Sequence, residues 1–584
     1  MGRQGVVGFL GCLLVILLSF GCASQARSVS QPLAIDDFES DESPWRWGRW
    51  MSDEPAPMLL SAEHVSQGKQ ALKMTFPAAE CFGIHTFALP RDWSAYDALR
   101  FDIYYDAPNG DPSNWLGFNV YIDDFQTTGW ETNFHEENWR LRPGWNYKQL
   151  DIDSIAGRRD AINPASVKAL YFILSDVPAN TVLYFDNIRL VPRKLASSAG
   201  GVPRLEVQAP SESNRTDRLT VTSPGRFELE FDPNVGTATR WFDLARDPGR
   251  RMNLVAEYGR LLNDKFGFKG EDGQPLQGSS YLAPTEVPVL LEASPVRARV
   301  RMLCPGARSY GGGPLRANVQ GTTDYTIYPT GRVFVRNELR VVGEPYRSHH
   351  FQFNLKTSWA AYHGSGGEAI QSAGKDFILH THRGPGVTAD ALLVWHAGER
   401  PTSYFDAPYE RMFYRSGVQL AEAMDKVLAP GTSLSWCFML QLKPDDLDSE
   451  DAARPYALDY RNPAKVTVTR GALVTDDPGD ANGDGFNEAE GCTVLSADEG
   501  GQVAFVFDPG EVTHYWPVFK VRHWTGAPAR IEAAGRLLSY GEDYIWDFVE
   551  PWWSPSTGEQ TLLIELLQPV TERTEFVLTP TDAR

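Results

Sequence analysis

Alternation between apolar and polar positions is the dominant pattern of this chain. Segments 98–106, 116–125, 169–175 and 181–191 alternate over most of their length, and clusters of Gly, Pro, Asn and Asp separate them. A period of two is typical of β-strands that bury one face. The helical period of 3.6 is scarce, and the best helix candidate is 417–431, which ends at a Pro-Gly. The sequence therefore predicts a nearly all-β protein.

The strand signals fall into three blocks, 32–192, 205–444 and 464–584. Residues 193–204 are rich in small residues, Pro and Gly, which predicts a linker between the first two blocks. Evenly spaced strands in the third block predict a small β-sandwich. A length of 584 residues allows three or four domains.

The N-terminus predicts export. Arg3 precedes an apolar run over 6–20, which is short for a membrane span, and "SFGC" ends at Cys22. A small residue before a cysteine resembles the lipobox of bacterial lipoproteins, although Ser19 stands where that family prefers Leu. The resemblance implies that 1–21 is a lipoprotein signal peptide, that Cys22 is lipidated and that the protein is anchored in the outer membrane. An ordinary signal peptide, giving a periplasmic or secreted protein, is the alternative.

Charge and composition narrow the range of partners. The formal net charge of −20 argues against nucleic acid and against an anionic membrane surface, although a local basic pocket could still bind an anionic sugar. The chain has 17 Trp, 22 Tyr and 30 Phe, and an exported, acidic, aromatic-rich composition is common among glycan-handling proteins. The cysteines show no CxxC spacing for zinc, and Cys304 with Cys437 is a candidate disulfide.

The first block opens with "AIDDFES" and closes with "VLYFDNIRLV". This combination resembles the jelly-roll carbohydrate-binding modules of the galactose-binding-like type. The resemblance implies a structural calcium beside the opening and closing strands, with Glu39 and Asp186 at the matching positions. Indole rings stack on sugar rings, so the tryptophans of this block are candidate glycan-binding residues, with packing in the core as the alternative. These candidates are Trp45, Trp47, Trp50, Trp115, Trp130 and Trp139.

The second block contains "GRFELEFDPNVG" and, later, "TTDYTIYPTGRVFVRNELRV". The order of its strands resembles the β-supersandwich of the galactose mutarotase-like group. That architecture also occurs in polysaccharide lyases and in several glycoside hydrolases. The resemblance implies a large sandwich that handles sugars.

Six of the eleven histidines lie in this block: His349, His350, His363, His380, His382 and His396. We expect neighbouring strands to gather several of them on one face, for a metal site or for acid–base chemistry on a sugar; ordinary surface positions are the alternative. A lyase that cleaves beside a uronic acid needs a base, an acid and a group that neutralises the carboxylate. The segment "PYRSHH" offers His349 or His350 as the base, Tyr346 as the proton donor and Arg347 for the carboxylate. We favour His350, which shares a face with Tyr346 if the strand is regular.

The run "DANGDGFNEAEG", 480–491, predicts a calcium loop. Asp480, Asn482 and Asp484 take positions 1, 3 and 5, a glycine takes position 6, and the Phe486 carbonyl takes position 7. This spacing resembles the first half of an EF-hand or dockerin loop. Position 12 is Gly491, so Glu488 or Glu490 has to supply the last ligand. We expect a structural calcium that stabilises an exposed loop between strands, with a metal-free acidic turn as the alternative.

These observations favour an exported polysaccharide-active protein that binds a polysaccharide or oligosaccharide, uses calcium structurally and needs no organic cofactor. Lyase-type cleavage of an acidic, uronate-containing glycan is the leading hypothesis. A non-catalytic glycan-binding surface lipoprotein is the alternative, and a glycoside hydrolase is third, because no pair of carboxylates is singled out by spacing. The chain lacks the helical toroid that supplies the base in several lyases, which argues against the leading hypothesis.

Overall fold

A computed structural model gives the structure of the protein. It describes residues 31–48, 57–76, 79–110, 116–126, 134–141, 143–152, 162–192, 201–209, 218–232, 237–250, 253–255, 262–269, 275–278, 288–304, 307–309, 312–316, 319–343, 345–357, 368–371, 377–384, 387–395, 401–409, 413–420, 427–442, 450–524, 527–549 and 560–581. For part of these residues only the backbone is described.

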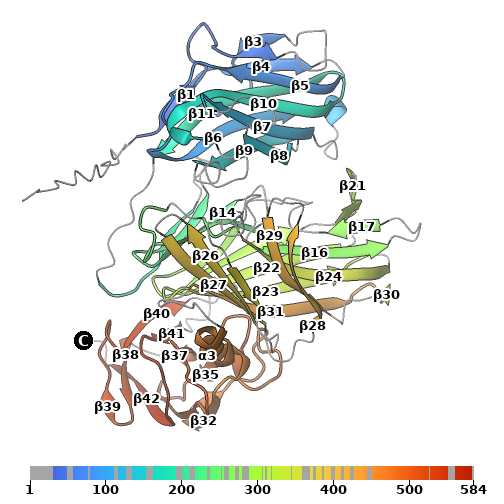
Figure 1. Ribbon diagram of the computed structural model, residues 1–584. Helices are drawn as coiled ribbons and strands as arrows, with labels where there is room; N and C mark the ends of the chain where they lie inside the picture. Colours follow the sequence, from blue (N-terminus) through green and yellow to red (C-terminus); the bar gives the residue numbers. More distant parts are fainter. Residues whose placement is uncertain are drawn as a thin grey trace, which may run out of the picture.

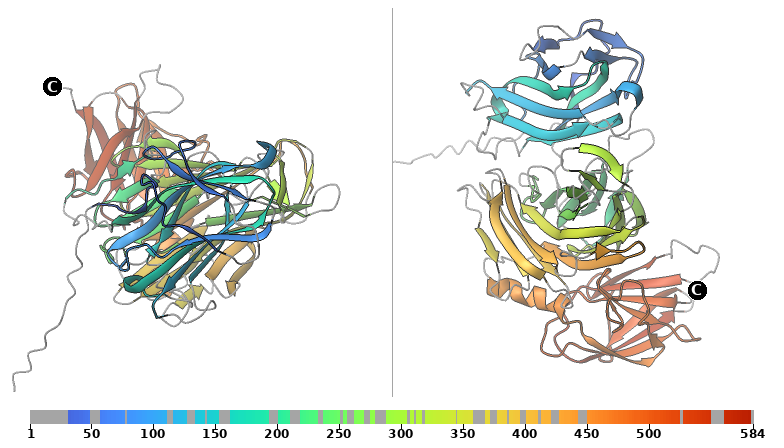
Figure 2. Two further views of the ribbon diagram at one scale, coloured as in Figure 1. Left: turned by 90° about the horizontal axis from the view of Figure 1, so that it is seen from above. Right: turned by 90° about the vertical axis from the view of Figure 1, so that its right-hand side faces the viewer.

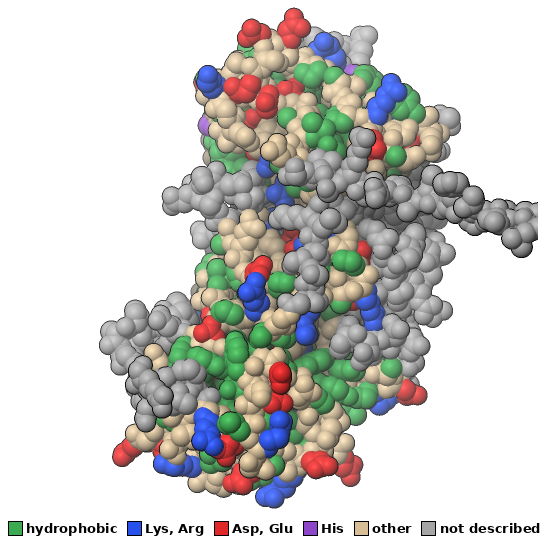
Figure 3. Space-filling model, turned by 90° about the vertical axis from the view of Figure 1, so that its left-hand side faces the viewer, with side chains coloured by type: hydrophobic (Ala, Val, Ile, Leu, Met, Phe, Trp, Pro, Cys, Tyr) green, Lys and Arg blue, Asp and Glu red, His purple; other side chains and the backbone are tan. Residues whose placement is uncertain are grey.

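The described chain forms three β-sheet domains that follow one another along the molecule (Figures 1 and 2). The predicted all-β class is confirmed. The helical elements of the described part are α3 (Glu450–Arg461) and the short 3₁₀ turns η1 (Pro108–Gly110) and η3 (Pro164–Ser166). No helix there is long and apolar enough to cross a membrane. Acidic and basic side chains are interspersed on the face shown in Figure 3.

The first domain is a sandwich of two antiparallel sheets. One has the order β3-β4-β11-β6-β9, with β1 paired to β11, and the other has the order β2-β5-β10-β7-β8. Their strands are β1 (Leu33–Asp36), β2 (Arg46–Gly48), β3 (Met58–Ser61), β4 (Ala71–Phe76), β5 (Ala79–Thr86), β6 (Tyr96–Asp106), β7 (Leu116–Asp124), β8 (Phe134–Leu141), β9 (Gly144–Asp151), β10 (Val167–Val177) and β11 (Thr181–Pro192). Alternate residues of a strand face the same side of its sheet, and Leu99, Phe101 and Ile103 of β6 accordingly lie together in the core between the two sheets.

The central domain contains two eight-stranded sheets and one four-stranded sheet. The four-stranded sheet is β12 (Glu206–Gln208), β13 (Leu219–Ser223), β14 (Phe227–Asp232) and β15 (Thr237–Asp243). One large sheet is β16 (Leu262–Lys269), β17 (Pro275–Gly278), β20 (Ala307–Ser309), β21 (Gly312–Arg316), β24 (Tyr346–Thr357), β28 (Pro401–Tyr409), β29 (Phe413–Leu420) and β30 (Val427–Leu428). The other is β18 (Val289–Ala293), β19 (Ala298–Cys304), β22 (Val319–Ile327), β23 (Arg332–Val341), β25 (Glu368–Gln371), β26 (Phe377–Gly384), β27 (Val387–Trp395) and β31 (Ser433–Leu442).

The C-terminal domain is a smaller sandwich. Its five-stranded sheet is β32 (Lys465–Arg470), β36 (Val503–Asp508), β38 (Ala527–Ala533), β39 (Arg536–Leu537) and β42 (Thr574–Thr581). Its six-stranded sheet is β33 (Ala472–Leu473), β34 (Phe486–Asn487), β35 (Cys492–Ser496), β37 (Val518–Trp524), β40 (Tyr544–Val549) and β41 (Gln560–Leu566). Apart from one parallel pair, β35 with β37, the pairs in these sheets are antiparallel.

A shared hydrophobic core joins the central and C-terminal domains. It combines Phe334 and Met439 of the central domain, Tyr460 of α3, and Val494 and Leu563 of the C-terminal domain. Helix α3 packs on β26 and β27. Burial of these apolar side chains across the boundary indicates that the two domains form one cooperative unit.

Two sequence expectations are wrong. The predicted helix at 417–431 begins in β29 and includes β30, while 421–426 lie outside the described residues. Strand pairing overrides the local helical pattern there, because Gln419 pairs with Gln352 of β24. The candidate disulfide is also absent, because Cys437 is a free, buried thiol. Strands β22 and β23 separate β19, which ends at Cys304, from β31, which contains Cys437.

Candidate functional site

The outer face of the five-stranded sheet of the first domain carries a row of polar and aromatic residues. Arg46, His85, Tyr171 and Tyr121 are paired in register across β2, β5, β10 and β7. Their sequence neighbours Ile84 and Phe172 lie in the core instead. Because side chains alternate between the two faces of a sheet, the row projects away from the core.

Three rings gather at one end of this face. The centroids of His85 and Phe87 lie 5.1 Å apart, those of His85 and Tyr171 lie 5.6 Å apart, and those of Phe87 and Tyr171 lie 6.5 Å apart. Phe87 follows the last residue of β5, and its side chain is 57% exposed. An exposed ring supported by two others offers a flat apolar surface for a ligand.

Polar groups lie beside these rings. The Tyr171 hydroxyl donates to Asp123 Oδ2 at 3.1 Å, and Lys168 Nζ lies 3.9 Å from the same oxygen. Burial and the Asp123 charge raise the pKa of the Tyr171 hydroxyl, so Tyr171 stays protonated. Asp124 has a structural role instead, because it accepts the N–H groups of Gln126 and Asn163 and so fixes the loops at this end of the sheet.

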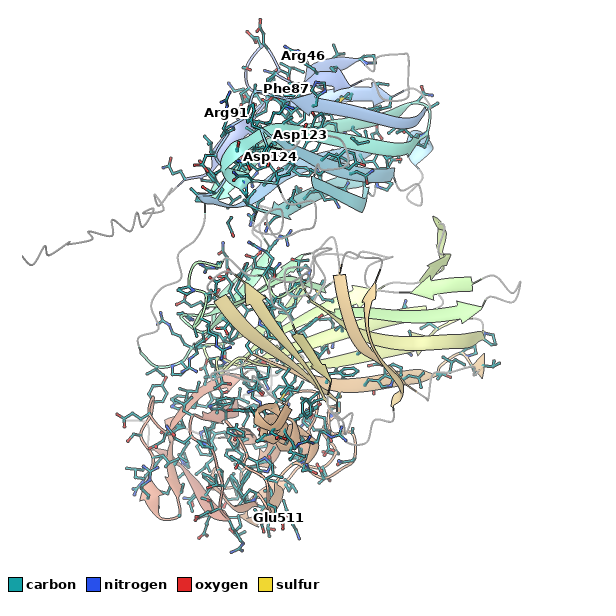
Figure 4. All side chains as sticks on the ribbon, viewed as in Figure 1. Arg46, Phe87, Arg91, Asp123, Asp124 and Glu511 are labelled. Carbon is teal, nitrogen blue, oxygen red and sulfur yellow. The ribbon has the colours of Figure 1, made fainter. Side chains whose placement is uncertain are left out.

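Cationic side chains frame the same end of the sheet, where Figure 4 labels Arg46, Phe87, Arg91 and Asp123. The Arg91 guanidinium lies over the exposed Phe125 ring, 4.6 Å from its centroid. His85 Nδ1 is buried and has no hydrogen-bond partner in the described part of the chain. Burial and, secondarily, the Arg46 charge lower the pKa of His85, so its imidazole is neutral at neutral pH.

The predicted tryptophans give a different picture. Trp45 is wrong as a glycan-binding residue, because its side chain is 1% exposed and stacks on Phe172 in the core at 5.0 Å. Trp45 immediately precedes β2, which has only three residues, too few for alternation to identify the buried face. The remaining predicted side chains lie outside the described residues: Trp47, Trp50, Trp115, Trp130 and Trp139. Phe87, His85 and Tyr171 were missed because they come together only through the pairing of β5 with β10, and the sequence does not reveal which strands pair.

The side chains of the predicted catalytic segment, Tyr346, Arg347, His349 and His350, lie outside the described residues. The backbone of β24 is described, and its pairing with β16 shifts register between Ser348 and His350. A bulge breaks strict alternation, so the regular spacing assumed for Tyr346 and His350 does not hold. The base and donor roles stay predictions.

The predicted gathering of histidines on neighbouring strands is wrong for the strands described. His380 and His382 belong to β26, which is in the other eight-stranded sheet from β24. His363 and His396 lie outside the described residues. No local pattern in the sequence distinguishes strands of one large sheet from strands of the other.

The loop 480–491 brings carboxylates together as expected. Asp480, Asp484 and Glu488 each offer an oxygen within 4.8 Å of the others, which is the one such group of three found among the described residues. Asp480 Oδ1 accepts the N–H of Gly483 at 2.6 Å, and its Oδ2 accepts the N–H of Gly485 at 2.8 Å. These bonds curl the backbone so that the side chains converge.

The donor set fits a hard divalent cation. Glu488 is fully buried, and burial, with smaller contributions from the charges of Asp484 and Asp480, raises its pKa to about 7. A bound cation would offset the repulsion among the three carboxylates, and calcium prefers several carboxylate oxygens as ligands. Asn482 Oδ1 accepts the N–H of Asp484 at 2.9 Å, and its amide donates to Glu488 at 3.3 Å, so Asn482 braces the loop. Phe486, whose carbonyl is the predicted seventh-position ligand, lies in β34.

The second half of the loop is not exposed, contrary to expectation. Glu490 is no member of the carboxylate group: its side chain binds Arg297 at 2.7 Å and Lys520 at 3.0 Å at the boundary of the central domain. The Tyr328 hydroxyl donates to the Glu490 carbonyl, and Gly491, at φ +64°, faces the Phe334 ring so closely that a Cβ would lie 2.0 Å from it. The loop therefore supports the contact between two domains.

Glu39 and Asp186, the other predicted calcium ligands, hold one loop from two sides. Glu39 Oε1 accepts the N–H groups of Lys69 and Gln70, and Asp186 Oδ2 accepts those of Ser66 and Gln67. Neither residue belongs to a group of three converging metal-ligand side chains among the described residues, so calcium here stays a prediction.

Comparisons with protein-family models and with curated proteins gave no match. Several solved structures are similar to part of the chain. The family 11 carbohydrate-binding module of the cellulosomal cellulase Lic26A-Cel5E of Clostridium thermocellum is 15% identical, with 28% of this chain and 96% of the module covered and a TM-score of 0.21. The family 30 module of the cellulosomal cellulase Cel9D-Cel44B of the same organism is 12% identical, with 27% and 98% covered and a TM-score of 0.23. An exo-β-agarase is 14% identical, with 29% and 26% covered and a TM-score of 0.21. Scores of this size carry no argument about the function of this protein.

Proposed function

We propose that the first domain binds a glycan on the outer face of its five-stranded sheet. The observation that carries the proposal is the exposed Phe87 ring, held against His85 and Tyr171 beside Asp123. A sugar presents an apolar C–H face and a polar rim of hydroxyl groups. An aromatic ring flanked by hydrogen-bonding groups matches both features.

Charge supports a glycan over nucleic acid as the ligand. The chain has a net charge of −20, and acidic and basic groups are mixed on the surface visible in Figure 3. A polyphosphate backbone needs a continuous basic surface. The export signal predicted from the sequence is consistent with a ligand outside the cell. Cleavage of the bound glycan stays a prediction that no described side chain supports, and release of an unsaturated, ultraviolet-absorbing product is its assay.

The proposal predicts that Phe87→Ala weakens glycan binding at least about tenfold, a loss of about 1.4 kcal/mol. Affinity gel electrophoresis of the full chain through a panel of soluble neutral and acidic polysaccharides measures this effect. Leu537→Ala removes another exposed apolar side chain, in the C-terminal domain, and serves as the control. Equal retardation of Phe87→Ala and the wild type on every retarding polysaccharide would contradict the assignment of the face.

We also propose that the loop 480–491 binds one calcium ion through Asp480, Asp484 and Glu488. The role would be structural, because the loop supports the contact between the central and C-terminal domains. Calcium would neutralise carboxylates that otherwise repel one another across less than 4.8 Å.

EDTA is therefore expected to lower the melting temperature, and Asp484→Ala should remove this sensitivity. Calcium at one hundred times its dissociation constant adds about 2.7 kcal/mol of stability. Glu511→Ala, which changes an exposed carboxylate outside the loop, is the matched control. Differential scanning calorimetry with and without calcium decides the question: identical melting curves would show that the loop binds no calcium.

A further inference from the structure

The proposed glycan-binding face carries three cationic side chains, although the chain as a whole is acidic. Arg46, Arg91 and Lys168 all belong to the end of the sheet that carries the Phe87 ring. Arg46 and Arg91 are exposed, and Lys168 is 42% exposed. In a protein of net charge −20, such a local group of cations favours an anionic ligand by charge complementarity.

Three acidic groups at this end of the sheet are engaged in hydrogen bonds. Asp123 accepts from Tyr171 and lies near Lys168, and Asp124 is buried and accepts backbone N–H groups. Asp92, next to Arg91 in the sequence, accepts the N–H and the hydroxyl of Ser94. These carboxylates hold the fold, while the exposed guanidinium of Arg46 is anchored by one nitrogen, Nη1, on the Ser43 and Trp45 carbonyls.

His85 lies beside Arg46 on this face. It is paired in register with Arg46, and its buried Nδ1 has no partner in the described part of the structure. A buried polar nitrogen without a hydrogen-bond partner is unfavourable, and such a group in a native structure calls for a functional or structural reason.

We propose that the sugar stacked on Phe87 is a uronic acid whose carboxylate accepts hydrogen bonds from the exposed Arg46 guanidinium beside His85. This inference rests on the proposed glycan binding and names the class of sugar. The fork of a guanidinium matches the two oxygens of a carboxylate, and bonds between charged groups are stronger than those to a hydroxyl. Arg91 and Lys168 lie where they would attract the neighbouring acidic units of the same chain.

The test compares each acidic polymer with its own neutral ester. Polygalacturonate is paired with its methyl ester, and alginate with its propylene glycol ester, while a neutral β-glucan completes the panel. Binding to the full chain is measured by calorimetry in about 150 mM salt, where distant charges are screened. We expect one acidic form to bind at least about tenfold more tightly than its ester, and Arg46→Ala to remove most of that difference.

Arg204→Ala, an exposed arginine of the linker paired with Glu206, is the matched control and should change nothing. Thermal melting of each variant verifies that it is folded. Equal binding of acid and ester, binding of the β-glucan alone, or an unchanged preference in Arg46→Ala would overturn the uronate assignment while leaving glycan binding intact. Failure of every polymer to bind would instead count against the proposed function itself.

Discussion

Arg297→Ala is expected to destabilise the protein by about 3 kcal/mol, because it breaks a buried ion-pair network between two domains. Arg297 is 2% exposed; its Nε and Nη2 donate to Glu292, and its Nη1 donates to Glu490. The Glu292 carboxylate would lose both of these bonds. Glu490 would keep Lys520 and Arg299, which limits the loss.

Arg301→Ala is the matched control for this effect. Arg301 lies in β19, which begins one residue after Arg297, and forms a two-bond pair with Asp324 at 2.7 Å for each bond, but its side chain is 30% exposed. Water can solvate the partner after truncation, so we expect a loss of no more than about 1 kcal/mol. Urea unfolding followed by intrinsic fluorescence measures both variants. Equal shifts of their transitions would show that the domain boundary is not held by the buried network.

Glu565→Gln is expected to remove a dependence of stability on pH. Glu565 is fully buried in β41, accepts the Thr330 hydroxyl at 2.6 Å, and has a second oxygen without a partner in the described part of the chain. Burial raises its pKa to about 8, so the native state holds a proton at neutral pH that the unfolded state releases. Its contribution to stability is thus full below the unfolded pKa near 4.5 and declines as pH rises to about 8, by up to about 1.4 kcal/mol per pH unit.

The variant keeps the shape and the hydrogen bond but carries no titrating group. The free energy of unfolding of Glu565→Gln, relative to that of the wild type, should therefore rise by about 3 kcal/mol between pH 5 and pH 8. Urea transitions at a series of pH values measure this difference. Glu572→Gln, an exposed carboxylate of the same domain, is expected to follow the wild type. Parallel pH profiles for Glu565→Gln and the wild type would contradict a buried, protonated Glu565.

Local patterns were enough for four strands of the first domain, β6, β7, β10 and β11. In 181–191 the apolar residues Leu183 and Phe185 lie in the core as alternation predicts. Alternation does not reveal which strands pair with one another. The row of Arg46, His85 and Tyr171 exists only because β2, β5 and β10 pair in one register. The candidate binding face therefore could not be read from the sequence.

The loop 480–491 shows the same limit at longer range. Its ligand spacing was visible in the sequence, and the converging carboxylates fit it. The burial of its second half depends on Phe334 and Arg297, which are far away in the chain. The helix α3 was missed although Ala453, Tyr456, Ala457 and Tyr460 have helical spacing, because Pro455 interrupts the pattern.

Hydroxyl-radical footprinting of the full-length protein, with and without the tightest-binding polysaccharide, tests most directly whether the five-stranded face of the first domain binds a glycan. We predict that the glycan protects Phe87 and Tyr171 from oxidation, while the exposed Tyr540 of the C-terminal domain reacts as before. Protection confined to the segment 346–350 of the central domain, with Phe87 equally reactive in both states, would contradict glycan binding on this face.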